Sequence, residues 1–145
     1  MISSESLKGK VKHIAKSKRL SSQEVLQMFF FERVLERLSN SRYKLNFVIK
    51  GGLLISSMIG IDNRTTMDLD TTVKGFPLKK EIIKDIMLEI LSIEVNDGIE
   101  FKVMDITNIR DEDKYENFRV HLTAVFGKIR NTMKIDITTG DVITP

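Results

Sequence analysis

The sequence predicts an α+β fold within a single domain of 145 residues. Apolar residues recur at helical spacing in the first third of the chain, whereas the last third alternates apolar and polar residues between short turns. Consecutive strands of this kind favour antiparallel pairing, so we expect a mixed or antiparallel sheet packed with helices and not a doubly wound one. A hydrophobic content of 41% suffices for one core of ordinary domain size.

Two amphipathic helices are expected at the N-terminus. The first covers residues 4–16, where lysines occupy most positions outside the apolar stripe. The second begins with Ser21 as its N-cap, because Glu24 stands three residues later as the partner of a capping box, and it continues to about Ser39. The stripe expected on the first helix consists of Leu7, Val11, Ile14 and Ala15.

The rest of the chain predicts strands and two further helices. Runs of β-branched and aromatic residues between Gly, Pro, Asn and Asp indicate strands over residues 45–49, 67–73, 99–106, 118–126 and 132–137. Helical spacing indicates a short helix over residues 53–59 and a longer one over residues 78–92. A glycine pair separates the first strand from the short helix.

The composition excludes several classes of protein. Without cysteine, the chain cannot form disulfides, a thiolate metal site or a cysteine nucleophile. Its two histidines, His13 and His121, show no pattern of a zinc site. No apolar run approaches the ~20 residues that span a bilayer, and the N-terminus has no apolar signal region. We therefore expect a cytoplasmic protein without a membrane partner.

Positive charge is concentrated in the first third of the chain. Residues 1–50 carry 11 Lys and Arg against 4 Asp and Glu, whereas residues 51–145 carry 12 against 16. A basic flank beside an acidic body is typical of a protein that handles a polyanion next to a carboxylate site. The same pattern also fits a lysine-rich helix that is simply solvated.

The strongest chemical pattern is Asp68-Leu69-Asp70 within a predicted strand. Because side chains alternate across a strand, both carboxylates point to one face, with Cα atoms about 6.6 Å apart. A divalent cation relieves their repulsion, and oxygen ligands favour Mg²⁺ or Mn²⁺ over zinc. Two solvated surface aspartates are the alternative interpretation.

Two further features extend this pattern. The glycines at residues 51–52 would let backbone N–H groups approach a triphosphate, although they also suit a tight turn without a ligand. Asp136 lies between two isoleucines in an apolar strand and needs a compensating partner. That partner is a metal shared with Asp68, if their strands are neighbours. The alternatives are an exposed aspartate on an edge strand and an aspartate paired with Lys134 or Arg130.

Together these motifs resemble the core of the polymerase-beta-like nucleotidyltransferase superfamily. More narrowly, the chain is similar to the AbiEii/AbiGii family of toxin nucleotidyltransferases, whose pattern is an apolar strand, K-G-G, a short helix and R-x-[ST]-x-D-[IL]-D. The matching stretches are Phe47-Val48-Ile49-Lys50-Gly51-Gly52-Leu53-Leu54 and Arg64-Thr65-Thr66-Met67-Asp68-Leu69-Asp70. Residues 134–145 are similar to the family's third-carboxylate strand and the loop after it. The resemblance covers the chain from about Ser21 onward.

The resemblance implies a metal-dependent nucleotidyltransferase that moves a nucleoside monophosphate from an NTP to an acceptor hydroxyl. Asp68 and Asp70 would hold Mg²⁺ or Mn²⁺, and Asp136 would bind the metal on the acceptor side and help to remove the hydroxyl proton.

The resemblance also implies a nucleotide site at the strand-to-helix turn. Gly51 and Gly52 would contact the triphosphate through backbone amides, with Lys50 or Arg64 as charge partners of the phosphates. Thr66 would hydrogen-bond a phosphate or cap the turn. For Lys50 and Arg64, structural salt bridges are the alternative.

As partners, the resemblance implies an antitoxin protein of a toxin–antitoxin or phage-defence system and an RNA acceptor such as a tRNA end, which the basic first helix could contact. The alternatives are a small-molecule nucleotidyltransferase of the antibiotic-modifying type and a non-catalytic nucleotide-binding module. Relatives continue into a helical C-terminal part beyond the position of Pro145, so we expect a truncated chain or an N-terminal domain whose own activity is open.

Overall fold

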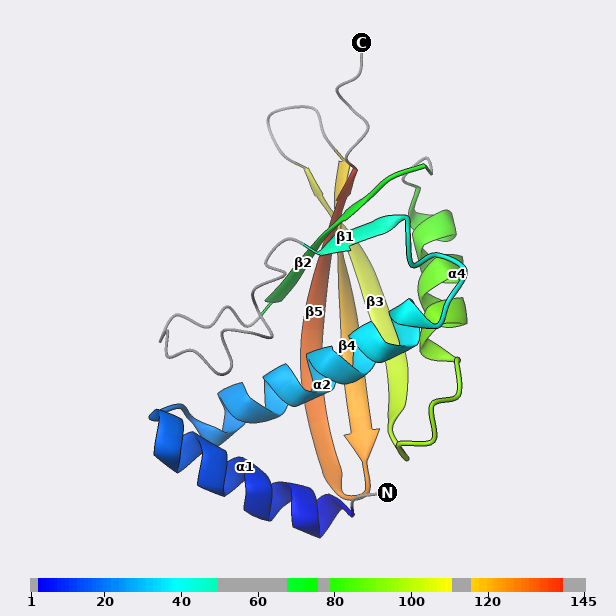
Figure 1. Ribbon diagram of the computed structural model, residues 1–145. Helices are drawn as coiled ribbons and strands as arrows, with labels where there is room; N and C mark the ends of the chain where they lie inside the picture. The colour runs from blue at the N-terminus through cyan, green and yellow to red at the C-terminus, as the bar shows by residue number, and fades with distance from the viewer. Residues whose placement is uncertain (1–2, 50–67, 76–78, 111–115, 140–145) are drawn as a thin grey trace.

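The computed structural model describes residues 3–49, 68–75, 79–110 and 116–139. They form helices packed on a five-stranded sheet, which confirms the predicted α+β class (Figure 1). No helix in these ranges is both long and apolar enough to cross a bilayer. The elements are α1 (Ser4–Lys18), α2 (Ser22–Ser39), β1 (Phe47–Ile49), β2 (Asp68–Val73), α4 (Lys80–Leu91), β3 (Glu100–Arg110), β4 (Glu116–Phe126) and β5 (Ile129–Thr139).

The strands follow the order β1-β2-β5-β4-β3 across the sheet. β2 pairs in parallel with β5, whereas the other neighbouring strands pair antiparallel. The antiparallel pairing of the three late strands is therefore confirmed. The parallel pair brings the strand that contains Asp68 and Asp70 next to the strand that contains Asp136, which a shared site requires.

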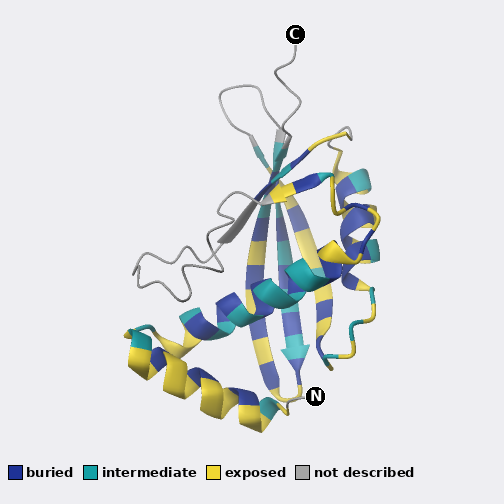
Figure 2. Ribbon diagram, in the orientation of Figure 1, coloured by how far each residue is buried: buried dark blue, intermediate teal, exposed yellow. Residues whose placement is uncertain are grey.

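One face of the sheet is apolar and the other is polar. Along β5, buried residues alternate with exposed or half-buried ones, and the same alternation continues in β4 (Figure 2). α2 crosses the apolar face and α4 lies beside β3 (Figure 1). The core residues that β4 and β5 contribute include Phe118, Val120, Leu122, Met133, Ile135 and Ile137.

A local capping box fixes the start of α2, as predicted. The Glu24 backbone N–H donates to Ser21 Oγ at 3.0 Å, and the Ser21 N–H donates to Glu24 Oε1 at 2.8 Å. These two bonds satisfy N–H groups that have no partner inside the helix, and such a cap contributes about 1 kcal/mol. α2 ends at Ser39, also as predicted.

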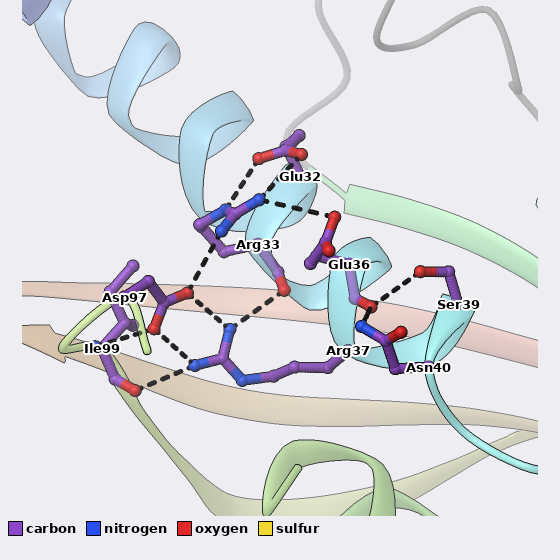
Figure 3. Close-up of polar contacts among 8 residues, drawn as sticks. All are labelled: Glu32, Arg33, Glu36, Arg37, Ser39, Asn40, Asp97 and Ile99. Carbon is purple, nitrogen blue, oxygen red and sulfur yellow. Dashed lines mark hydrogen bonds and ion pairs between the residues drawn. The ribbon is translucent and has the colours of Figure 1, made fainter. Parts of the chain in front are cut away.

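A buried ion pair joins α2 to the segment that leads into β3 (Figure 3). Arg37 is 3% exposed and donates to both carboxylate oxygens of Asp97, from Nη2 at 2.8 Å and from Nη1 at 2.9 Å. It also donates to the backbone carbonyls of Arg33 and Ile99, each at 3.0 Å. No pattern in the sequence identifies this contact, which fixes the position of α2 against the sheet.

The charge of Asp97 is stabilised despite its partial burial. Burial raises the pKa of the Asp97 carboxyl, but the hydrogen bonds from Arg37 and from the Ile99 N–H, with the charges of Arg37 and Arg33, outweigh it. The pKa of Asp97 therefore lies below its ordinary value, and this carboxylate is ionised around neutral pH.

The predicted burial of Ile14 is wrong. Its side chain is 41% exposed, whereas the other three members of the expected stripe are buried. α1 packs against α2, and its buried residues form a narrow stripe at positions 7, 11 and 15 that leaves Ile14 outside it.

Strand boundaries also differ from the prediction. Leu45 is 85% exposed because the chain is still in a turn there, closed by the Asn46 N–H donating to the Tyr43 carbonyl at 2.8 Å, and β1 begins only at Phe47. The three late strands have 11 residues each and are longer than predicted. The short helix predicted over residues 53–59 lies outside the described residues.

β3 contains an irregularity at Met104. The pairing with β4 shifts between Val103 and Asp105, and Met104 is 62% exposed. Beyond this point the even-numbered Ile106 occupies the core face, so Asp105 and Thr107 fall on the polar face.

Candidate active site

The candidate site lies where β2 and β5 run side by side. In their parallel register Asp70 pairs with Asp136, and Asp68 pairs with Lys134. Adjacent strands are about 4.8 Å apart, and register partners share a face of the sheet. The structure thus confirms that positions 70 and 136 are neighbours on one face, whereas the catalytic role of these residues stays a prediction.

Two threonines, of which Thr71 is buried and Thr138 half-buried, hold these two strands in register. The Thr71 hydroxyl donates to the backbone carbonyl of Asp136 at 3.2 Å, and the Thr138 hydroxyl donates to the Thr71 carbonyl at 3.4 Å. Thr71 is almost fully buried, so its hydrogen bond forms away from water. The backbone at Asp136 is therefore fixed relative to β2.

Asp136 lies on the polar face and is paired with an arginine of β4. Its neighbours Ile135 and Ile137 are buried on the core face. Arg119 donates from Nε to Oδ1 at 2.8 Å and from Nη2 to Oδ2 at 3.1 Å. The two side chains are 33% and 21% exposed for Arg119 and Asp136, respectively. The protein cation beside Asp136 is thus Arg119 and neither of the two that the sequence suggested, Lys134 and Arg130, whereas the shared metal stays a prediction.

Arg119 was missed because its proximity depends on the pairing of β4 with β5. A pattern in the sequence could have found it. The two-residue turn at Gly127 and Lys128 pairs Phe126 with Ile129, and counting outward from that pair places Arg119 opposite Asp136. Gly127 has a φ of 61°, the conformation that such hairpin turns require of glycine.

Acidic and basic positions lie side by side on the polar face around Asp136. One row of register partners runs from Asp70 through Asp136 and Arg119 to Thr107, and the next runs from Asp68 through Lys134 and His121 to Asp105. The first row joins two acidic positions to one cation. This arrangement suits a ligand that combines phosphate groups with a divalent cation.

The other candidate residues belong to the segment between β1 and β2. Lys50, Gly51, Gly52, Arg64 and Thr66 lie outside the described residues. β1 ends at Ile49, which pairs with Thr71, so the described chain stops next to β2 at the level of the candidate site.

The donors of this strand pair fit a hard divalent cation, because aspartates supply only carboxylate oxygens. Among the side chains that the structure describes, no three acidic or histidine residues are grouped as a metal site. That description includes Asp136, whereas the side chains of Asp68 and Asp70 lie outside it.

Comparisons with known proteins identify a family. Residues 33–145 match the family model described as "Nucleotidyl transferase AbiEii toxin, Type IV TA system". No curated protein matches the chain.

Two solved structures from Helicobacter pylori are similar to the chain. JHP933 is 20% identical with a TM-score of 0.44, and the match covers 86% of this chain and 47% of JHP933. The other, a provisionally assigned nucleotidyltransferase, is 21% identical with a TM-score of 0.47, with coverage of 86% and 49%. The chain therefore spans about half the length of the solved proteins that it matches.

Proposed function

Because the chain belongs to the AbiEii family of nucleotidyl transferase toxins, we propose that it transfers a nucleoside monophosphate from an NTP to an acceptor hydroxyl. Residues 1–145 form one nucleotidyltransferase core domain in this proposal. Its metal-binding residues are Asp68, Asp70 and Asp136, with Mg²⁺ or Mn²⁺ as the cation. The observation that supports it most directly is the register of β2 and β5, which pairs Asp70 with Asp136.

In the proposed reaction, the acceptor oxygen forms a bond to the α-phosphorus while the bond from that phosphorus to the pyrophosphate oxygen breaks. Divalent cations, when bound, supply positive charge to the attacking and leaving oxygens. A carboxylate oxygen of Asp136 accepts the proton of the acceptor hydroxyl. The buried Ile135 and Ile137 keep this carboxylate on a rigid strand, which catalysis of this kind requires.

The triphosphate binds to the segment that follows β1. Gly51 and Gly52 contribute backbone N–H groups, Lys50 and Arg64 contribute positive charge, and Thr66 contributes a hydroxyl. The position of β1 supports this proposal. Because β1 ends beside β2, the segment that follows it begins next to the carboxylate positions.

The proposed acceptor is RNA, with a tRNA end as the specific candidate, and an antitoxin protein is the proposed cellular partner. A surface groove between α1, the start of α2 and the start of β5 includes Lys8, Lys12 and Arg130 in its lining. Cationic side chains of this kind bind phosphates in a salt-dependent manner. The exposed cations of α1 are Lys8, Lys10, Lys12 and Lys16, and Arg19 follows directly after the helix.

The proposal is tested by incubating the protein with each α-³²P-labelled NTP, Mg²⁺, and either total tRNA or a panel of small hydroxyl-bearing acceptors. We expect label on the RNA, and its loss in Asp70→Asn and Asp136→Asn. Asp85→Asn, which changes an exposed aspartate on α4, serves as the matched control and should transfer at the wild-type rate.

The other outcomes point to different functions. Label on a small acceptor alone would identify a small-molecule nucleotidyltransferase. NTP binding without transfer to any acceptor would indicate a nucleotide-binding module. Full transfer by both aspartate variants would refute the proposed site.

A further inference from the structure

Asp136 forms a bidentate ion pair with Arg119. Both of its carboxylate oxygens accept hydrogen bonds from Arg119, at 2.8 Å and 3.1 Å. The arginine comes from β4, on the side of β5 opposite to β2, so it flanks Asp136 from the direction away from Asp70. The proposed metal ligand Asp136 is therefore already ion-paired with a cationic side chain of the protein.

The pairing has a physical cause. Asp70 and Asp136 occupy adjacent register positions, where two negative charges destabilise each other. A guanidinium remains charged at any physiological pH and matches both oxygens of one carboxylate. Arg119 thus compensates the charge that a divalent cation would otherwise compensate.

We propose that Arg119 is a positioning residue that acts as the counter-ion of Asp136 in the metal-free protein and thereby sets the affinity of the site for divalent cations. This inference rests on the proposed function. Before Asp136 becomes a full metal ligand, its carboxylate exchanges the Arg119 guanidinium for the cation. Because the positive charge of Arg119 competes with the cation, the site has a lower affinity for the metal than its carboxylates alone would give.

The same contact keeps the Asp136 side chain oriented. Two parallel hydrogen bonds fix the plane of the carboxylate, whereas a lysine at position 119 would provide charge without the planar fork. The charge and the orientation are separable contributions, and two different substitutions distinguish them.

The test measures Mn²⁺ binding to the 145-residue chain by titration calorimetry and by electron paramagnetic resonance, without nucleotide. We expect Arg119→Gln to bind Mn²⁺ roughly ten-fold more tightly than the wild type, because a competing charge is removed. Arg119→Lys, which retains the charge, should bind with an affinity near that of the wild type. A gain in affinity cannot result from misfolding, which would weaken binding.

Arg130→Gln is the matched control. Arg130 is an exposed arginine on the same face of β5, and its separation from Asp136 corresponds to about 20 Å along the strand. This distance exceeds the screening length of about 8 Å at physiological salt, so we expect less than about a two-fold change in Kd.

The outcomes separate this inference from the proposed function. One outcome refutes the role of Arg119 alone. In it, the wild type binds Mn²⁺ and Asp136→Asn binds it more weakly, but Arg119→Gln binds it no more tightly than the wild type. The metal site then stands. If neither the wild type nor Arg119→Gln binds Mn²⁺, the metal site itself is wrong. Tighter binding by Arg119→Gln together with an equal gain in Arg130→Gln would also overturn the inference, because net charge alone would explain it.

Discussion

Replacing Asp97 with asparagine tests the buried ion pair that anchors α2. The substitution removes a carboxylate that accepts hydrogen bonds from Arg37 at 2.8 Å and 2.9 Å, and it leaves a guanidinium that is only 3% exposed without its counter-charge. Breaking such a pair on one side costs about 3 kcal/mol, because a buried charge is left uncompensated. Domains typically have only about 5–15 kcal/mol of stability, so the loss is a large share of it.

Urea unfolding followed by circular dichroism measures this loss. With a urea dependence of about 2 kcal/mol per molar, the unfolding midpoint of Asp97→Asn should fall by roughly 1.5 M. The matched control is Glu89→Gln, which breaks the pair between Glu89 and Arg42, whose side chains are 42% and 72% exposed. Because solvent screens exposed pairs, the control midpoint should stay close to that of the wild type.

The pH dependence gives a second readout. Folding lowers the pKa of Asp97 below its ordinary value of 3.8. Its contribution to stability is therefore fully present above the unfolded pKa and is lost as the pH falls through the folded pKa. The difference in stability between wild type and Asp97→Asn should be constant near neutral pH and shrink below about pH 4. A midpoint shift no larger than that of the control, or a difference that persists in acid, would refute this account of the pair.

Three further predictions concern the turn, the helix cap and the basic helix. Gly127→Ala should lower the free energy of unfolding by about 1–2 kcal/mol, because the residue has a φ of 61° and an added Cβ would collide with Ser4; unchanged urea unfolding would contradict this. Ser21→Ala should cost about 1 kcal/mol in the same assay through loss of the capping box, and a loss below a few tenths would show that the cap is dispensable. Lys8→Gln with Lys12→Gln should weaken tRNA binding in fluorescence anisotropy and reduce its salt slope by about two, whereas an unchanged slope would place the RNA elsewhere.

The features that the sequence predicted correctly depend on neighbouring residues. The capping box of α2 involves Ser21 and Glu24, which are three positions apart, so the pattern contains all the atoms required. The antiparallel pairing of the three late strands followed from their consecutive order in the chain. That Asp70 and Asp136 lie on neighbouring strands is a hypothesis based on the chemistry of a shared metal, and the register of β2 with β5 agrees with it.

The features that escaped prediction depend on distant residues. Arg37 and Asp97 are 60 residues apart, and nothing near either residue identifies the other as its partner. Arg119 could be matched with Asp136 only by extending the hairpin register over several residue pairs. The irregularity at Met104 changes the alternation of β3 without a glycine or proline to mark it. The exposure of Ile14 has a similar cause. The sequence of α1 does not define how wide a stripe of its surface is covered by α2.

The two-residue turn between β4 and β5 determines which side of the sheet presents the aspartate. A change at this turn that slipped the register of β5 by one residue would turn every β5 side chain to the opposite face of the sheet. Asp136 would then enter the apolar interior, and the isoleucines beside it would emerge into solvent. Loops of another length are therefore compatible with the aspartate only where they keep the pairing of Phe126 with Ile129, or carry a bulge that restores the phase.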